Sequence, residues 1–253
     1  MSRKVRLTQV KAIQTISPHL KRFVLSGNEL DDFPTEQDGA HVKVLLPHQG
    51  QKLPNLDING ENPAVKRSYT IREFDAPNKQ LVLDFVINRH QGPATNWANS
   101  AKVGDYLGIA GPGVRKLTDF NANSYVLIGD LTSVNAVNGY AKFISPNAEL
   151  IAIVSVPTQA DVIAMNAGKH LKVHWHVADE NPSALPDMVY ELVKDMDKNS
   201  QVFIGLEASE VRAVKSLLLH ELDFNRLNIH ATAYWKQGMN ADQLGAERKR
   251  NPL

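Results

Sequence analysis

The sequence predicts an N-terminal antiparallel Greek-key β-barrel followed by a C-terminal α/β domain with a parallel sheet. From residue 5 to about residue 115, short alternating or β-branched runs are separated by turn residues, which is typical of antiparallel strands that close into a barrel. After residue 123, apolar runs alternate with segments of helical spacing, which indicates a parallel sheet covered on both faces. The hydrophobic pattern changes from the first kind to the second near residues 116–123. We therefore expect domains at 1–118 and 119–238, and a tail at 239–253.

The individual elements follow from the same patterns. The barrel strands are predicted at 5–13, 21–25, 41–46, 68–73, 81–87 and 106–110. The strands of the second domain are predicted at 124–128, 149–155, 172–177, 201–205 and 228–233, and its helices at 136–144, 184–196 and 209–222. The loop at 47–63 is long for a compact domain, which makes it a candidate functional segment.

Composition excludes several classes of chemistry. A formal net charge of +1 provides no long-range field for nucleic acid, and the absence of cysteine excludes disulfides, thiolate nucleophiles and cysteine-ligated iron–sulfur clusters. No run reaches the roughly 18 apolar residues of a membrane span, and the start lacks a signal-peptide core. We expect a cytoplasmic monomer, without membrane insertion, whose redox chemistry would need a bound cofactor.

The tetrapeptide Arg67-Ser68-Tyr69-Thr70 opens a predicted strand and combines a cation, an aromatic plane and hydroxyl groups. A flavin dinucleotide needs partners for a pyrophosphate, a ring system and a ring nitrogen, and these side chains match those needs. Taken alone, the same residues also fit an edge strand with a solvated arginine.

A second motif joins the strand Asp84-Phe85-Val86-Ile87-Asn88 to the turn Gly92-Pro93-Ala94-Thr95, with Trp97 two residues further on. A helix that begins with small residues leaves backbone N–H groups accessible to an anion such as pyrophosphate. The alternative is an ordinary helix start with proline in its first turn.

Together with Gly104-Asp105, Gly111-Pro112, Gly129-Asp130, Gly205 with Glu207, and Tyr234-Trp235 with Gly238, these motifs make the chain resemble the siderophore-interacting proteins. That family consists of FAD-dependent ferric-siderophore reductases related to the ferredoxin–NADP reductase superfamily. The resemblance runs from about residue 3 to residue 238. It implies that NADH or NADPH delivers electrons through FAD to a chelated Fe(III), which leaves as Fe(II).

The resemblance also implies roles for individual residues. Thr70 and Tyr69 would lie at the reactive part of the flavin. The residues implied to contact FAD are Arg67, Ser68, Tyr69, Thr70, Asp84, Val86, Asn88, Gly92, Pro93, Ala94, Thr95, Trp97, Tyr234 and Trp235, and those implied to contact the nicotinamide nucleotide are Asp130, Thr132, Ser133 and Glu207.

Two positions depart from the family pattern. Asn88 stands where the family usually has a histidine, so this side chain can form hydrogen bonds but cannot become cationic. The stretch Gly129-Asp130-Leu131-Thr132-Ser133 lacks the acid that usually follows the aspartate, which changes the expected nicotinamide contacts.

Charges provide the remaining expectations. An anionic or oxygen-rich ferric chelate favours cations beside the flavin, and the candidates are Lys43, His48, Lys52 and Lys236; the alternative for each is a solvated surface charge. Residues 156–161 contain no Lys or Arg for a 2′-phosphate, which favours NADH. His174 and His176 share a strand face, but no further ligand completes a metal site, so no resident metal is expected.

Two other functions remain open from the sequence. A related flavin reductase could pass electrons to a protein carrier such as flavodoxin or ferredoxin, although near-neutral composition provides little basis for a strongly basic docking face. A non-catalytic protein that binds ferric chelates is the other alternative. Such a protein would purify without the yellow colour of a flavin.

Overall fold

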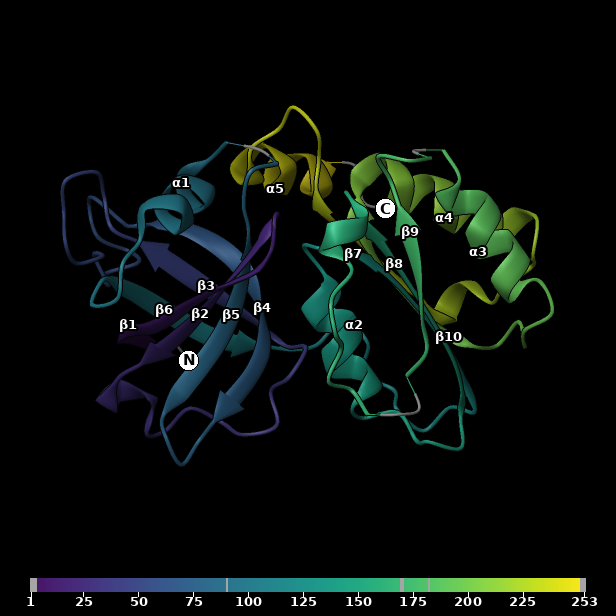
Figure 1. Ribbon diagram of the computed structural model, residues 1–253, viewed down its shortest axis with the longest axis horizontal. Coiled ribbons are helices and arrows are strands. Elements are labelled where there is room, and N and C mark those ends of the chain that lie inside the picture. The colour runs from purple at the N-terminus through teal and green to yellow at the C-terminus, as the bar shows by residue number, and fades with distance from the viewer. Residues whose placement is uncertain (1–3, 90, 169–170, 182, 251–253) are drawn as a thin grey trace. The chain divides into compact units, whose positions relative to one another are not determined.

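The computed structural model describes residues 4–89, 91–168, 171–181 and 183–250 (Figure 1). The chain forms two compact units, Met1–Arg115 and Lys116–Leu253. The residues after Gly238, which we expected to form a separate tail, belong to the second unit. No helix among the described residues is both long enough and apolar enough to cross a membrane.

The first unit is a closed barrel, as predicted, with the strand order β1-β2-β5-β4-β3-β6 and antiparallel pairing throughout. Alternation explains its core: Leu81, Leu83 and Phe85 of β5 are fully buried inside, while Asp84 between them points to the other face. The strands are β1 (Val5–Ser17), β2 (Leu20–Ser26), β3 (His41–Leu46), β4 (Val65–Asp75), β5 (Gln80–Val86) and β6 (Tyr106–Gly113), joined by the short helices η1 (Asn28–Leu30) and α1 (Pro93–Ser100).

The long loop after β3 covers part of the barrel wall. Leu56 and Ile58 pack against a small buried cluster that includes Leu45 and Ala110. A methyl group at Gly108 would lie 2.8 Å from Leu56 Cδ2, so this glycine makes room for the loop. The contacts give the segment a packing role that its length alone did not indicate.

The second unit contains a five-stranded parallel sheet in the order β11-β10-β7-β8-β9, which confirms the predicted α/β class. Since β8 follows β7 on one side and β10 lies on the other, the strand order reverses between β7 and β10. Parallel sheets of this type bind ligands at the carboxyl ends of the strands flanking such a reversal. The strands are β7 (Ser124–Asp130), β8 (Glu149–Val156), β9 (Val173–Val177), β10 (Gln201–Glu207) and β11 (Ile229–Trp235).

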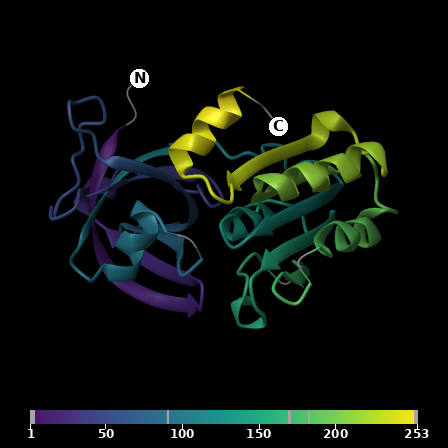
Figure 2. The same ribbon diagram turned by 90° about the horizontal axis from the view of Figure 1, so that it is seen from above.

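Helices cover both faces of this sheet. Helices α3 (Leu185–Val193) and α4 (Ala208–His220) lie next to each other and share one apolar cluster with β7, β8 and β10 (Figure 2). Helix α2 (Val134–Ala141) contacts β7 on the other face, where Tyr140 meets Phe203 edge-on. The short helices η2 (Gln159–Asp161) and η3 (Arg226–Asn228) lie in connections between strands.

Helix α5 (Ala241–Arg250) ends the described chain and was not predicted. One apolar residue, Leu244, joins the buried cluster of α3 and α4. The Glu247 carboxylate lies 2.6 Å from Lys236 Nζ and 3.9 Å from an Arg212 nitrogen. A single apolar anchor and one carboxylate therefore attach this polar helix, and a hydrophobic period in the sequence could not reveal it.

Candidate functional site

The wall of the barrel opens between β4 and β5. The two strands pair from Asp75↔Gln80 to Ile71↔Leu83, where the described ladder between them ends. Beyond that point β4 continues to pair with β3, and β5 continues to pair with β2. The edges at residues 69–70 and 84–86 consequently face each other without a shared ladder. Backbone groups on such edges can bind the hydrogen-bonding rim of a planar ring.

Aromatic side chains line this opening. The Tyr69 ring stacks on Phe85 with centroids 3.9 Å apart and an interplanar angle of 26°. Trp97 of α1 packs against Phe85 at 5.5 Å and against Phe23 at 5.0 Å. Burial raises the pKa of Tyr69, so its hydroxyl stays neutral. One face of the Tyr69 ring is thus occupied by Phe85, and Trp97 anchors α1 to the barrel.

Helix α1 begins with an open turn. Gly92 precedes the helix in an extended conformation, with φ 168°, and no side chain caps the helix. A methyl group added at Gly92 would meet no atom within 4 Å, whereas Ala94 and Thr95 behind it are buried. With Pro93 in the first turn, this helix start has the room and the polarity that a phosphate group needs.

Two polar residues of the β4 motif already have local contacts. Arg67 lies two residues from Tyr69, hence on the same side of β4, and donates a 2.8 Å hydrogen bond to the Lys66 carbonyl. Ser68 faces the opposite side and accepts a 2.6 Å bond from Lys43 Nζ. Lys43 and Ser68 therefore form one exposed polar pair. Their predicted roles toward chelate and FAD stay predictions.

Asp84 has a strong partner that sequence analysis did not find. Arg22 Nε and Nη2 donate to its two carboxylate oxygens at 2.7 and 2.9 Å, and the Asp84 side chain is only 1% exposed. Arg72 is buried nearby, where desolvation and the positive Arg22 lower its pKa. Arg22 was missed because only the β2–β5 register brings it opposite Asp84.

The other predicted barrel residues are placed as follows. Asn88 follows β5 in the left-handed region, with φ 60°, and donates to the Pro18 carbonyl at 3.1 Å. Val86 is half-buried at the end of β5. In the loop after β3, Lys52 Nζ lies 5.7 Å from the centre of the Tyr106 ring, and His48 Nε2 is buried without a hydrogen-bond partner among the described residues.

Ser133 links β7 and β10, the two strands between which the strand order of the parallel sheet reverses. Its Oγ donates to the Gly205 carbonyl at 2.5 Å and accepts from the Asp130 N–H at 3.0 Å, and the residue is fully buried. A methyl group at Gly129 or at Gly205 would clash with Ser133. These glycines thus leave room for one serine that links β7 to β10.

Carboxylates gather near the carboxyl ends of β7 and β10. Glu207 caps α4 by accepting hydrogen bonds from Ser209, and it also accepts one from the Gln237 N–H at 3.2 Å. Burial, together with the negative Asp130 and Glu207, raises the pKa of Glu210 to about 7. This edge of the sheet is therefore unfavourable for additional negative charge.

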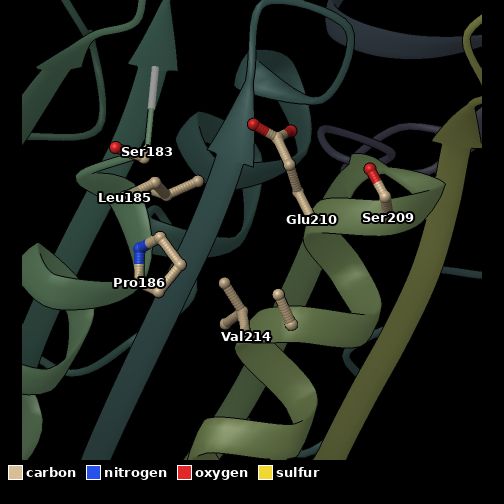
Figure 3. A pocket seen from close by; sticks show the side chains of 7 residues that line it. Ser183, Leu185, Pro186, Ser209, Glu210 and Val214 are labelled. Carbon is tan, nitrogen blue, oxygen red and sulfur yellow. The ribbon is translucent and has the colours of Figure 1, made fainter. Parts of the chain in front are cut away.

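Glu210 also borders a pocket of about 220 Å³ between the starts of α3 and α4 (Figure 3). Leu185, Pro186 and Val214 form its apolar part, and Ser183 and Ser209 add hydroxyl groups.

The aromatic pair at the end of β11 divides between two environments. The Tyr234 ring would contact a methyl group placed at Gly205 and lies edge-on to Phe203, at 6.3 Å. Trp235 is 36% exposed, and its Nε1 donates to Asp130 Oδ2 at 2.7 Å. Thr132 donates to the other Asp130 oxygen through both its N–H and its hydroxyl. Lys236, the predicted chelate contact in this unit, pairs with Glu247.

The described residues contain no cluster that could hold a metal ion. His176 uses both ring nitrogens, one with the Ser155 hydroxyl at 3.0 Å and one with the Asn181 carbonyl at 2.8 Å. Both ring nitrogens of His176 are thus engaged with protein groups, and the absence of a resident metal stays a prediction.

Comparison with known proteins matches both units. The siderophore-interacting FAD-binding domain matches residues 9–116, and the siderophore-interacting protein family matches residues 122–238. The siderophore-interacting protein SipS from Aeromonas hydrophila is 30% identical, with a TM-score of 0.83 and coverage of 98% of each chain. Ferric vibriobactin reductase ViuB from Vibrio cholerae is 29% identical over 92% of this chain and 90% of its own.

Two further proteins are less similar in sequence. Ferric acinetobactin reductase from Acinetobacter baumannii is 26% identical over 80% of this chain and 73% of its own. Phthalate dioxygenase reductase, at 12% identity and a TM-score of 0.72, shares the fold. The opening in the barrel wall, the uncapped start of α1, the parallel sheet and these matches lead to one conclusion: the chain belongs to the siderophore-interacting protein family.

Proposed function

We propose that this protein is a ferric-siderophore reductase that passes electrons from a nicotinamide nucleotide through FAD to chelated Fe(III). The observation that carries the proposal is the opening between β4 and β5, which lies beside Tyr69 and Phe85, with Trp97 of α1 packed against Phe85. It combines a strand edge for a ring with an uncapped helix start for phosphates. This arrangement fits a flavin dinucleotide better than it fits a metal chelate alone.

The residues toward FAD have distinct tasks in this proposal. Arg67 and the N–H groups at the start of α1 hold the pyrophosphate, while Tyr69 packs against the ring system. Thr70 provides a hydroxyl near the reactive ring nitrogen. Bound FAD supplies the conversion between a two-electron hydride donor and one-electron acceptors. One hydride reduces two Fe(III) to Fe(II), which hard anionic oxygen ligands hold less tightly, and leaves one proton.

We further propose NADH as the preferred donor. The segment after β8 has no Lys or Arg, and its Asp161 is buried in reciprocal hydrogen bonds with Thr158. Nearby in the same unit, Asp130, Glu207 and Glu210 interact electrostatically. A 2′-phosphate would add negative charge to this unit without a cation beside the segment to receive it.

The decisive experiment is anaerobic mixing of the purified protein with NADH or NADPH, followed by a ferric catecholate or hydroxamate chelate. We expect a yellow protein whose flavin absorbance bleaches with NADH and returns when the chelate is added, while a ferrous indicator reports Fe(II). A colourless protein that still binds the chelate would support a binding protein instead. Reoxidation by flavodoxin or ferredoxin, but not by chelates, would support the protein-carrier reductase.

A further inference from the structure

The carboxylate of Asp130 is directed toward the protein's own groups. Its Oδ1 accepts from the Thr132 N–H at 2.8 Å and from the Thr132 hydroxyl at 2.5 Å, and its Oδ2 accepts from the indole nitrogen of Trp235 at 2.7 Å. Asp130 itself is buried. An oxygen already engaged in this way is poorly available to a ligand, which argues against direct nicotinamide binding by Asp130.

The contact with Asp130 restricts the ring of Trp235. An indole has a single polar group, so a bond to that N–H limits how the side chain can rotate. In the strand order β11-β10-β7, the bond from Trp235 to Asp130 spans the end of β10. The pairing of β10 with β11 shifts between Leu206 and Glu207, at the level of Trp235. The result is an aromatic ring that is 36% exposed yet tied at one edge to a buried carboxylate.

The negative charge of Asp130 affects the Trp235 ring as much as the position of Asp130 does. A carboxylate that accepts a hydrogen bond from the indole N–H polarises the ring and makes its face more electron-rich. Such a face suits the nicotinamide ring, which becomes electron-poor as it gives up a hydride. Burial raises the pKa of Asp130, while the hydrogen bonds from Thr132 and Trp235 oppose that rise.

From these contacts we infer that Asp130 is a positioning residue, which fixes Trp235 as a platform for the planar ring of the nicotinamide. The inference rests on the proposed function and deepens it, because it replaces a predicted nicotinamide contact with an indirect role. The experiment must separate the contact itself from its consequence.

The contact can be tested without activity. The chain has three tryptophans, so a nitrogen-15 NMR spectrum of the holoprotein should contain three indole N–H signals, and Trp235→Phe assigns the signal of interest by its loss. We expect that signal to exchange slowly with solvent, and to exchange at least about tenfold faster in Asp130→Leu. Asp130→Asn keeps an acceptor and should stay near wild type, as should the exposed control Asp195→Asn. Rapid exchange in the wild type would overturn the inference.

The functional role is tested by a double-mutant cycle on anaerobic flavin reduction by NADH. Asp130→Leu and Trp235→Phe should each slow reduction, by about tenfold for a charged hydrogen bond, and the double variant should be no slower than Trp235→Phe. If Asp130→Leu slowed flavin reduction as much in the Trp235→Phe protein as it does in the wild type, Asp130 would act by a route that does not involve Trp235. Should Asp130→Leu not fold, Asp130→Ala takes its place in the cycle, and an unchanged rate in that variant would refute the role.

Two additional measurements on Asp130→Leu and Trp235→Phe identify the nucleotide that is affected. A raised KM for NADH with unchanged FAD affinity supports the platform for nicotinamide, and an unchanged KM for NADH with weakened FAD affinity would refute it. If neither nucleotide reduces the wild-type flavin, the proposed function fails and the positioning role fails with it, even where the indole proton is protected. If the wild type is reduced but Asp130→Leu matches its rate, only the positioning role fails.

Discussion

The guanidinium of Arg22 holds both carboxylate oxygens of Asp84, a residue whose side chain is 1% exposed, on the strand that borders the opening in the barrel wall. This bidentate pair explains why β5 can carry a charge at a buried position. It also changes the interpretation of Asp84: the family motif places this residue among the flavin contacts, while its carboxylate is satisfied by Arg22.

Replacement of Arg22 by Met should destabilise the protein by about 3 to 5 kcal/mol, because a buried carboxylate would lose its bidentate partner. Urea unfolding monitored by circular dichroism gives the value. The matched control is Lys79→Met, which breaks an exposed pair with Asp31 and should change stability by less than about 1 kcal/mol. If Arg22→Met and Lys79→Met had the same effect, the buried pair would not have the importance assigned to it.

Replacement of Arg67 by Ala should weaken FAD binding by about tenfold or more, since a charge-assisted contact to pyrophosphate would be lost. Flavin retained after dialysis, together with a titration of the stripped protein, measures the change. Lys66→Ala is a suitable control because the adjacent side chain points to the other side of β4. Equal FAD affinity in the Arg67→Ala and Lys66→Ala proteins would count against this placement of the pyrophosphate.

Two Gly→Ala changes should affect different properties of the protein, one FAD binding and the other stability. At Gly92 a methyl group has free space, so Gly92→Ala should leave the stability of the flavin-free protein unchanged but weaken FAD binding where phosphate approaches the backbone. At Gly205 a methyl group would lie 2.7 Å from Phe203 and 2.9 Å from both Ser133 and Tyr234. Gly205→Ala should therefore cost about 1 to 3 kcal/mol in unfolding free energy. Unaltered FAD affinity in Gly92→Ala would exclude close phosphate approach at that turn.

Glu210 should make stability depend on pH. Its pKa is about 7 in the folded protein and lies at 4.5 without these surroundings, so the folded state binds more protons between those values and stability falls as pH rises through them. Glu210→Gln should equal the wild type near pH 4 and exceed it at pH 8 by on the order of 1 to 2 kcal/mol, after allowance for solvent screening.

Thermal or urea unfolding at the two pH values measures this difference. Glu221→Gln, which removes a charge at the other end of α4, should show no such pH-dependent gain. An equal gain for Glu210→Gln at both pH values would mean that the raised pKa of Glu210, from burial and from the negative Asp130 and Glu207, is not the cause.

The sequence by itself determined the two-domain architecture and the family. Strand alternation and helical periodicity are local properties, so they predicted the barrel and the parallel sheet, with β3 at its observed bounds. Motifs such as Arg67 to Thr70 are contiguous and could be recognised without knowledge of contacts. Helix α5 was not predicted because its attachment depends on Leu244 and Glu247 rather than on a repeating apolar face.

Only the tertiary structure decided which partners the motif residues have. The pairing of Arg22 with Asp84 depends on strand register, and the bond from Trp235 to Asp130 depends on strand order within the sheet. Ser133 lies between two glycines that are far apart in the chain. Register and strand order follow from packing over the whole domain, which no local pattern encodes. For that reason the sequence could propose the residues of a site, while the fold assigned several of them to each other.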